Sequence, residues 1–380
     1  MQFYILDALN RRQTLVDSYI SAVWVERFDK KGELQLVVAS TYENRLLFRT
    51  GKMIACDLSY RVMLIETAEK AVDDEGRSVI NVSGYSLESI FENRVAKDVI
   101  DELETYPTWD LTGTPGAIAR QIVHDICVTG ILSTSDIITN LVEQTILPES
   151  MIAESSTSID LSLEPQSVYE ALTSICTDYA LGFRILRNGD NGFLYFDVYS
   201  GNNRTSAQTT FPAVIFSPEL DSLENTTEYV STDGMKNVAY AFAPTIAAEI
   251  YPDWADPDAI DFERRVLVVK SDADNIDDLT TDAKTELAKY NRLIAFDGEI
   301  TASNPFVYDE DYYLGDIVEV RNTDGAASYM RVTEQIISSD ANGVKSYPTF
   351  TIDTAVSADV WAAQGVKVWD DYTTEYWDDV

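Results

Sequence analysis

The sequence contains the stretch Tyr312-Tyr313-Leu314-Gly315-Asp316-Ile317-Val318-Glu319-Val320, which is followed by Met330-Arg331-Val332-Thr333-Glu334 and by Thr349-Phe350-Thr351-Ile352-Asp353. The chain also carries an earlier version, which runs Phe48-Arg49-Thr50-Gly51-Lys52-Met53-Ile54-Ala55-Cys56, then Val62-Met63-Leu64-Ile65-Glu66, then Val79-Ile80-Asn81-Val82-Ser83-Gly84. In each version a glycine turn opens a strand, a second strand ends near a glutamate, and a third strand follows a turn that contains glycine. Glycine suits such turns because it reaches positive φ at little cost. The signature residues are Gly51, Glu66, Gly315, Asp316 and Glu334. They predict two copies of a small β-module, and chance recurrence of a common strand–turn pattern is the alternative.

A duplicated module has a consequence for symmetry. Three such chains would present six similar modules around one axis. A protein needs that arrangement when it joins a threefold object to a sixfold tube.

The chain is strongly acidic. Its 380 residues include 64 Asp and Glu against 28 Lys and Arg, which gives a formal net charge of -36. Proteins that grip phosphate backbones need clustered Lys and Arg, so specific binding to nucleic acid or to an anionic membrane is not expected. Solubility explains most of the acids. A lining of acids along a channel through which DNA passes is the sharper alternative, and composition does not choose between the two.

Length and cysteine usage indicate a non-secreted protein of several domains. A chain of 380 residues suggests two to three domains. No stretch approaches the ~20 apolar residues of a membrane helix, and the first residues lack the basic start of a signal peptide. Cys56, Cys127 and Cys176 lie far apart in apolar patterns, which predicts buried free thiols rather than a metal or redox site.

The predicted fold is mixed and mainly β, with two similar small antiparallel β-barrels and an inserted α+β domain. Short segments rich in β-branched and aromatic residues, separated by turn residues, fill the N-terminal region. These segments are Phe3–Leu6, Ala22–Phe28, Glu33–Ala39, Met53–Cys56, Arg61–Glu66 and Val79–Gly84. Six strands within so short a stretch favour a small barrel or sandwich.

The middle of the chain predicts two helices. The first begins at Thr114-Pro115, a hydroxyl cap followed by proline. The second follows Glu164-Pro165 and is expected to end at Gly182 as a C-terminal cap. Apolar residues recur at helical spacing in both, at Ile118, Ile122, Val123 and Ile126 and at Val168, Leu172, Ile175, Cys176 and Tyr179.

These patterns divide the chain into five parts. Residues 1–95 and 212–244 are assigned to the first β-barrel, 96–211 to the inserted α+β domain, and 298–355 to the second β-barrel. Residues 245–297 are expected to form an acidic loop or arm and then a helix from about Asp278 to Arg292. The tail, 356–380, places large aromatic residues among acids, namely Trp361, Trp369, Tyr372, Tyr376 and Trp377. Such a segment cannot bury its rings alone, so we expect a partner to hold it.

No motif indicates catalysis. The one histidine, His124, lies in a predicted helix, and no Cys/His pair has the spacing of zinc ligands. The run Gly84-Tyr85-Ser86-Leu87-Glu88 lacks the last glycine of a nucleophile elbow, and no phosphate-binding loop is present. The aspartates at 272, 274, 277 and 278 depart from a calcium loop, since Ile276 occupies the third ligand position. We therefore expect no catalytic, metal or cofactor site.

Two short runs are the most distinctive of the chain, Phe216-Ser217-Pro218-Glu219 and Leu314-Gly315-Asp316-Ile317-Val318. Other distinctive pieces follow one another along nearly the whole chain, at Tyr4–Asp7, Ser21–Trp24, Gly32–Leu36, Gly51–Ile54, Val82–Glu88, Gly182–Arg184, Tyr195–Thr205, Lys236–Tyr240 and Arg331–Glu334. In their shared order these pieces resemble the tail-hub proteins of siphophages, in the form common in phages of actinobacterial hosts.

The resemblance implies a non-enzymatic virion protein at the distal end of a phage tail, assembled in the host cytoplasm. The homotrimer would form a pseudo-sixfold ring below the distal tail protein ring, with the tape-measure protein in its lumen until DNA passes through. Tail-tip or receptor-binding proteins would attach to it, and residues 356–380 would dock onto a neighbouring subunit or the next tip protein. No cofactor and no membrane insertion are implied. A tail-tip carbohydrate-binding adhesin and a cell-wall hydrolase are the alternatives.

Overall fold

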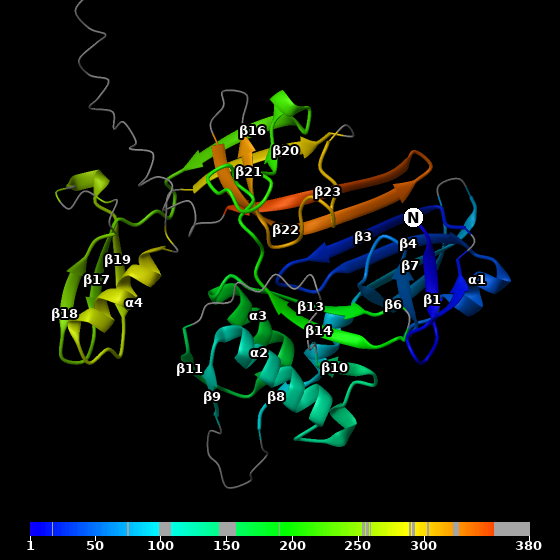
Figure 1. The fold of residues 1–380 in the computed structure, drawn as a ribbon, viewed down its shortest axis with the longest axis horizontal. Helices are drawn as coiled ribbons and strands as arrows, with labels where there is room; N and C mark the ends of the chain where they lie inside the picture. The colour runs from blue at the N-terminus through cyan, green and yellow to red at the C-terminus, as the bar shows by residue number, and fades with distance from the viewer. Residues whose placement is uncertain are drawn as a thin grey trace, which may run out of the picture. The chain divides into compact units, whose positions relative to one another are not determined.

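A computed structural model describes the chain as two compact units (Figure 1). The first comprises Met1–Pro212, Phe306–Ile317 and Arg331–Phe350, and the second comprises the rest of the chain. The structure describes residues 1–16, 18–73, 76–98, 108–143, 157–189, 191–252, 255, 258, 260–288, 290, 293–301, 304–321 and 327–352. Each unit has its own core of buried apolar side chains.

An antiparallel sheet dominates the first unit. Its N-terminal strands are β1 (Phe3–Leu6), β2 (Arg12–Leu15), β3 (Ser21–Arg27), β4 (Glu33–Ala39), β5 (Met53–Cys56), β6 (Val62–Val72) and β7 (Ser78–Ser86). Across the sheet they run β3-β4-β7-β6-β5-β1-β2. Along β7 buried and exposed side chains mostly alternate, because successive side chains of a strand point to opposite faces. All six predicted segments are strands, whereas β2 and the short helix α1 (Tyr42–Leu47) were not predicted.

The mainly β class is confirmed, but no sheet in the described part of the chain closes into a barrel. In β22 (Ala327–Asp340), residues Glu334–Ser339 pair antiparallel with β3, and β23 (Gly343–Ile352) pairs with β22. In the first unit the sheet therefore runs from β23 at one edge to β2 at the other. The expectation of two separate barrels is wrong for the described residues. Strand β3 pairs with a strand from the other module, so neither module closes on itself.

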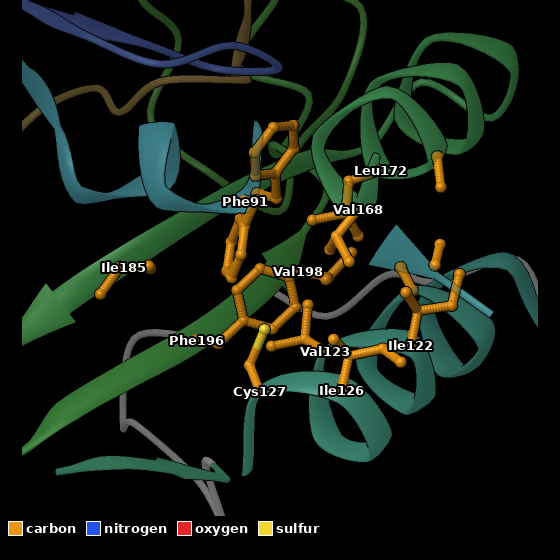
Figure 2. Packing of buried hydrophobic residues seen from close by; sticks show 14 of the residues in the cluster. Phe91, Ile122, Val123, Ile126, Cys127, Val168, Leu172, Ile185, Phe196 and Val198 are labelled. Carbon is orange, nitrogen blue, oxygen red and sulfur yellow. The ribbon is translucent and has the colours of Figure 1, made fainter. Parts of the chain in front are cut away.

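The inserted domain packs helices α2 (Pro115–Val123) and α3 (Val168–Asp178) against a small sheet. In this sheet β14 (Leu194–Tyr199) is antiparallel to β13 (Gly182–Arg187) and parallel to β10 (Leu141–Glu143). Two further pairs are β9 (Trp109–Gly113) with β11 (Ile159–Leu163) and β8 (Val95–Ala96) with β12 (Gln166–Ser167). Figure 2 shows the core, in which Phe91 meets Phe196 edge to face with ring centroids 5.5 Å apart.

Both helices of this domain begin at residues that cap them. The Thr114 side chain accepts the N–H of Ala117, as the sequence predicts, and α3 begins with a capping box between Ser167 and Glu170. Gly182 does not end α3. The chain leaves the helix at Ala180, which has a φ of 53°, and Gly182 begins β13. A Cβ at Gly182 would lie 2.3 Å from the Phe28 ring, so close packing rather than capping explains this glycine.

The second unit contains a three-stranded sheet with one helix on one face. Here β17 (Val238–Phe242) is antiparallel to β18 (Ala247–Ile250) and parallel to β19 (Val266–Lys270). The predicted helix is α4 (Ile276–Ala288), which buries Leu279 and Leu287 in this core. Strand β18 lies in the segment expected to be a loop. Elsewhere in the unit, β16 (Leu223–Ser231) pairs with β20 (Leu293–Ile300), and β15 (Ile215–Phe216) pairs with β21 (Ile317–Arg321).

Candidate assembly site

The Gly51 turn has a defined set of backbone hydrogen bonds. The N–H of Lys52 donates to the carbonyl of Arg49 (3.2 Å), and the N–H of Gly51 donates to the carbonyl of Ile65 (2.8 Å). The N–H of Ile65 donates back to the carbonyl of Lys52 (2.9 Å). Gly51 has a φ of 80°, as the third residue of a type II turn requires. Strand β5 begins two residues later, at Met53.

The Gly315 turn repeats this set. The N–H of Asp316 donates to the carbonyl of Tyr313 (3.1 Å), and the N–H of Gly315 donates to the carbonyl of Val332 (2.7 Å). The N–H of Val332 donates back to the carbonyl of Asp316 (2.9 Å). Gly315 has a φ of 90°, and β21 begins two residues later, at Ile317. The two predicted signature glycines therefore occupy turns with the same hydrogen bonds.

Asp316 anchors its turn, unlike the exposed Lys52 that follows Gly51. Its Oδ1 accepts the N–H of Asn202 (2.7 Å), and its Oδ2 accepts Nε of Arg204 (2.5 Å) and the N–H of Tyr313 (3.0 Å). Burial raises the pKa of the Asp316 carboxyl, and the donors from Asn202 and Arg204 oppose that rise. Asp316 thus ties the second turn to the loop after β14.

The two signature glutamates do not occupy equivalent places. Glu66 directly follows Ile65, at an irregularity in the pairing of β6 with β7, and is exposed. Glu334 is two residues beyond Val332, and its Oε2 accepts Nε of Arg27 at 2.6 Å. Glu334 therefore links β22 to β3, whereas Glu66 is exposed at the irregularity in β6.

A buried ion network in the first unit consists of Glu26, Arg61 and Glu88, the last in a short helix, η1 (Leu87–Asn93). The Arg61 guanidinium lies 3.3 Å from Oε1 of Glu88 and 3.7 Å from Oε2 of Glu26. The N–H of Ile185 also donates to Oε1 of Glu88 (2.7 Å). Desolvation opposes the charge on Arg61, but the attraction of Glu88 and Glu26 outweighs it and raises the pKa of the guanidinium. The network therefore joins the N-terminal sheet to β13.

Tyr308 brings a distant segment of the first unit to this network. Its hydroxyl donates to Oε2 of Glu26 (3.0 Å), while Nε1 of Trp24 donates to Oε1 of Glu26 (3.0 Å). Burial raises the pKa of Tyr308 well above its usual value, so the hydroxyl stays a neutral donor. Glu26 thus binds side chains from opposite ends of the sequence.

A second pair, between half-buried Arg184 and buried Asp197, lies beside the network. Nη2 of Arg184 is 3.0 Å from Oδ2 of Asp197, and the guanidinium lies 4.2 Å from the ring centroid of Tyr199. Burial raises the pKa of Tyr199 to about 12. In the part of the chain that the structure describes, the Tyr199 hydroxyl and Oε2 of Glu88 are buried without a hydrogen-bond partner.

Sequence reasoning missed this network. The sequence feature that indicated it was a charged residue within an apolar run. Glu26 follows Val23-Trp24-Val25, and Arg61 precedes Val62-Met63. A charge that interrupts a buried strand pattern needs a partner or a metal, so these positions could have been noted. Their partners, Glu88 and Tyr308, lie too far along the chain to be inferred from spacing.

Glu88, the last residue of the Gly84–Glu88 run, belongs to this network, whereas His124 makes a local contact. Nε2 of His124 is 3.0 Å from Oγ1 of Thr129, within one π-helical turn. The three cysteines are free and buried, as predicted, and burial raises the pKa of the Cys56 and Cys127 thiols to about 12. Oδ1 of Asn275 accepts the N–H of Asp278 (2.9 Å), so Asn275 caps α4.

Within the described ranges, no group of three or more His, Cys, Asp or Glu side chains could hold a metal ion. Among the helices that are described, none combines the length and the apolar character needed to cross a bilayer. Residues Trp361, Trp369, Tyr372, Tyr376 and Trp377 lie outside the described part of the chain.

Comparisons with known proteins give one consistent result. Residues 2–350 match the family model described as Siphovirus ReqiPepy6 Gp37-like protein. A tail protein from Neisseria meningitidis MC58 has a similar structure, with a TM-score of 0.58 and 13% identity, covering 94% of this chain and 98% of that chain. The 43 kDa tail protein of prophage MuSo2 from Shewanella oneidensis has a TM-score of 0.58 and 11% identity, covering 94% and 100%. Prophage tail protein gp18 from Listeria monocytogenes EGD-e has a TM-score of 0.50 and 11% identity, covering 97% and 100%. No curated protein matches the sequence.

Proposed function

Because the chain belongs to the family of siphovirus ReqiPepy6 Gp37-like proteins, we propose that this structural component of a siphovirus tail is the tail hub. As a homotrimer it adapts the sixfold tail tube and distal tail ring to the threefold tail tip, and it surrounds the channel for DNA ejection. It is a scaffold without an enzymatic role.

The matched hydrogen bonds of the Gly51 and Gly315 turns carry the proposal. They support a duplication in which β5-β6-β7 and β21-β22-β23 are related three-strand modules, each with its middle strand paired to both others. Three chains then supply six modules. Closed barrels are not required for this count, since a sixfold neighbour needs six similar surfaces and not six closed sheets.

The partners follow from the position of such a ring. The distal tail protein ring binds one face, and tail-tip or receptor-binding proteins bind the other. The tape-measure protein fills the lumen before ejection. The formal charge of -36 per chain would then keep DNA from adsorbing, because acids on the channel wall repel phosphate.

Mass and shape test the proposal. Native mass spectrometry of the purified protein should give three times the chain mass of 42.5 kDa. Negative-stain images should show a threefold particle with a central hole. A compact monomer would overturn the hub. Clearing of host cell wall in a zymogram would favour a hydrolase instead, and glycan binding by the isolated protein would favour an adhesin.

A further inference from the structure

We propose that the free edge of β2 binds the C-terminal segment, residues 356–380, of a neighbouring copy of this chain. The inference rests on the proposed trimer and adds to it a defined contact between subunits. The segment adds to the sheet next to β2 and places its aromatic side chains against apolar residues around the β1–β2 turn.

The first argument is the unpaired edge. In the first unit β2 has β1 as its single neighbour, with Tyr4 opposite Leu15 and Ile5 opposite Thr14. An edge strand presents unpaired N–H and C=O groups, which proteins protect with lysine or proline. At the opposite edge, β23 contains Lys345 and Pro348. Strand β2 contains neither residue type, so its edge is the one open to pairing.

The second argument is charge. Strand pairing places Arg12 opposite Leu6, and Ile5 opposite Ile54, so Arg11 and Arg12 lie at the same end of the sheet as Lys52. We call the exposed residues Arg12, Arg49 and Lys52 the basic corner; Arg11 beside them pairs with Asp7 at 2.9 Å. The Arg12 guanidinium lies 4.3 Å from the Tyr4 ring centroid and makes no ion pair within the described residues.

The C-terminal segment has the opposite charge. Residues 356–380 contain the acids Asp359, Asp370, Asp371, Glu375, Asp378 and Asp379 against the single base Lys367. In a chain with 64 acids and 28 bases, a basic corner is an unusual surface. The net acidic charge of the segment therefore complements this corner.

The third argument is exposed apolar surface beside the strand. Leu15 is 44% exposed, Leu9 48% and Phe193 39%. Contacts hold Leu9 and Phe193 near each other, since Nδ2 of Asn10 donates to the carbonyl of Gly192 (3.1 Å). The five aromatic residues of the segment need apolar partners of this kind.

The sheet order favours a neighbouring copy. The segment follows β23, which lies eight strand spacings from β2, about 38 Å along the sheet at ~4.8 Å per spacing. In a head-to-tail ring, the β2 end of one copy faces the β23 end of the next. The segment therefore reaches the β2 edge of a neighbour without crossing the face of its own sheet.

Cross-linking between singly substituted chains tests the inference. Chains with Gln13→Cys and chains with Thr373→Cys are co-expressed, purified as the assembly and treated with a short bismaleimide; the buried native thiols do not compete. A linked pair containing one chain of each kind is expected. A chain that carries both substitutions is treated in parallel. If a link forms only within that chain, and not between singly substituted chains, the inference is overturned. No link in an assembly with trimeric mass overturns it and leaves the hub intact, whereas the absence of a trimer contradicts both.

Charge reversal provides the second readout. Arg12→Glu should lower the yield of linked pairs about fivefold at ~0.15 M salt, since one attractive ion pair becomes repulsive. Lys70→Glu is the matched control, because Lys70 is exposed on β6 away from the β2 edge. Equal yields of linked pairs for the two variants would show that the basic corner does not contribute to binding.

Discussion

At the residue scale, Gly315 and Gly51 share a turn but differ in their surroundings. A Cβ on Gly315 would lie 2.3 Å from the Phe28 ring, whereas one on Gly51 would meet no atom within 4 Å. Gly51→Ala should cost about 1 kcal/mol of unfolding free energy, from positive φ alone. Gly315→Ala should cost about 2–4 kcal/mol, because overpacking adds to the same strain. Urea unfolding followed by tryptophan fluorescence measures both, and equal losses would contradict the assignment.

The buried ion network gives a second prediction. Arg61→Met should lower the unfolding free energy by about 3–5 kcal/mol, because it leaves the carboxylates of Glu26 and Glu88 buried without their cation. The control is Arg77→Met, which breaks an exposed pair with Asp73 (2.7 Å) and should cost less than about 1 kcal/mol. If the two variants lose the same stability, the network does not hold the first unit together.

The cysteines give a third prediction. Only the thiolate attacks thiol reagents, and a pKa of about 12 leaves almost no thiolate on Cys56 or Cys127 near neutral pH. The native protein should therefore leave its thiols unmodified by a chromogenic disulfide reagent at about pH 8, and all three should react after unfolding. Rapid labelling of the native protein would show that a thiol is reactive and accessible.

At the element scale, the start of α3 depends on a reciprocal cap. The Ser167 side chain accepts the N–H of Glu170 (3.1 Å), and the Glu170 carboxylate accepts the N–H of Ser167 (3.0 Å). Ser167→Ala should cost about 1 kcal/mol, and Ser167→Asp should retain most of the stability. Thermal unfolding compares the two variants, and equal losses would contradict the cap.

The same cap predicts a pH dependence with a definite sign. Hydrogen bonds from the Ser167 backbone and then its side chain lower the pKa of Glu170 below 4.5. A carboxyl whose folded pKa is lowered contributes stability that is present above its ordinary pKa and is lost as pH falls through the folded value. The stability difference between the natural chain and Glu170→Gln should therefore shrink below about pH 4.5. A difference that grows on acidification would contradict the cap.

Local signals predicted the elements better than their partners. The strands β1, β4 and β5 begin and end where apolar patterning and turn residues placed them, and Thr114 caps α2 as expected. Barrel closure was wrong because the pairing of β3 with β22 joins residues some 310 positions apart, which no local period encodes. The glycine turns were found for the converse reason: positive φ is a local requirement with its own residue type. The domain boundaries stay predictions.

At the scale of the whole molecule, the excess of acids predicts how the assembly treats DNA. A ring that conducts a genome must not bind it, and acids within a Debye length of ~8 Å of the duplex repel phosphate. The purified assembly should not retard duplex DNA in a gel at about 0.15 M salt. Retardation that falls steeply with added salt would indicate counterion release by clustered bases and would contradict the proposed lumen.

Amidation of the carboxylates separates the acids from every other cause of non-binding. Neutralising the exposed Asp and Glu would leave the 28 Lys and Arg opposed only by buried carboxylates such as Glu26 and Glu88, so the modified assembly should retard the same DNA while circular dichroism shows that the fold is retained. The modification changes charge and leaves the number of basic groups unchanged, so gained binding must come from lost repulsion. If the amidated assembly also fails to retard DNA, repulsion is not what keeps the genome from adsorbing, and the acids serve solubility alone.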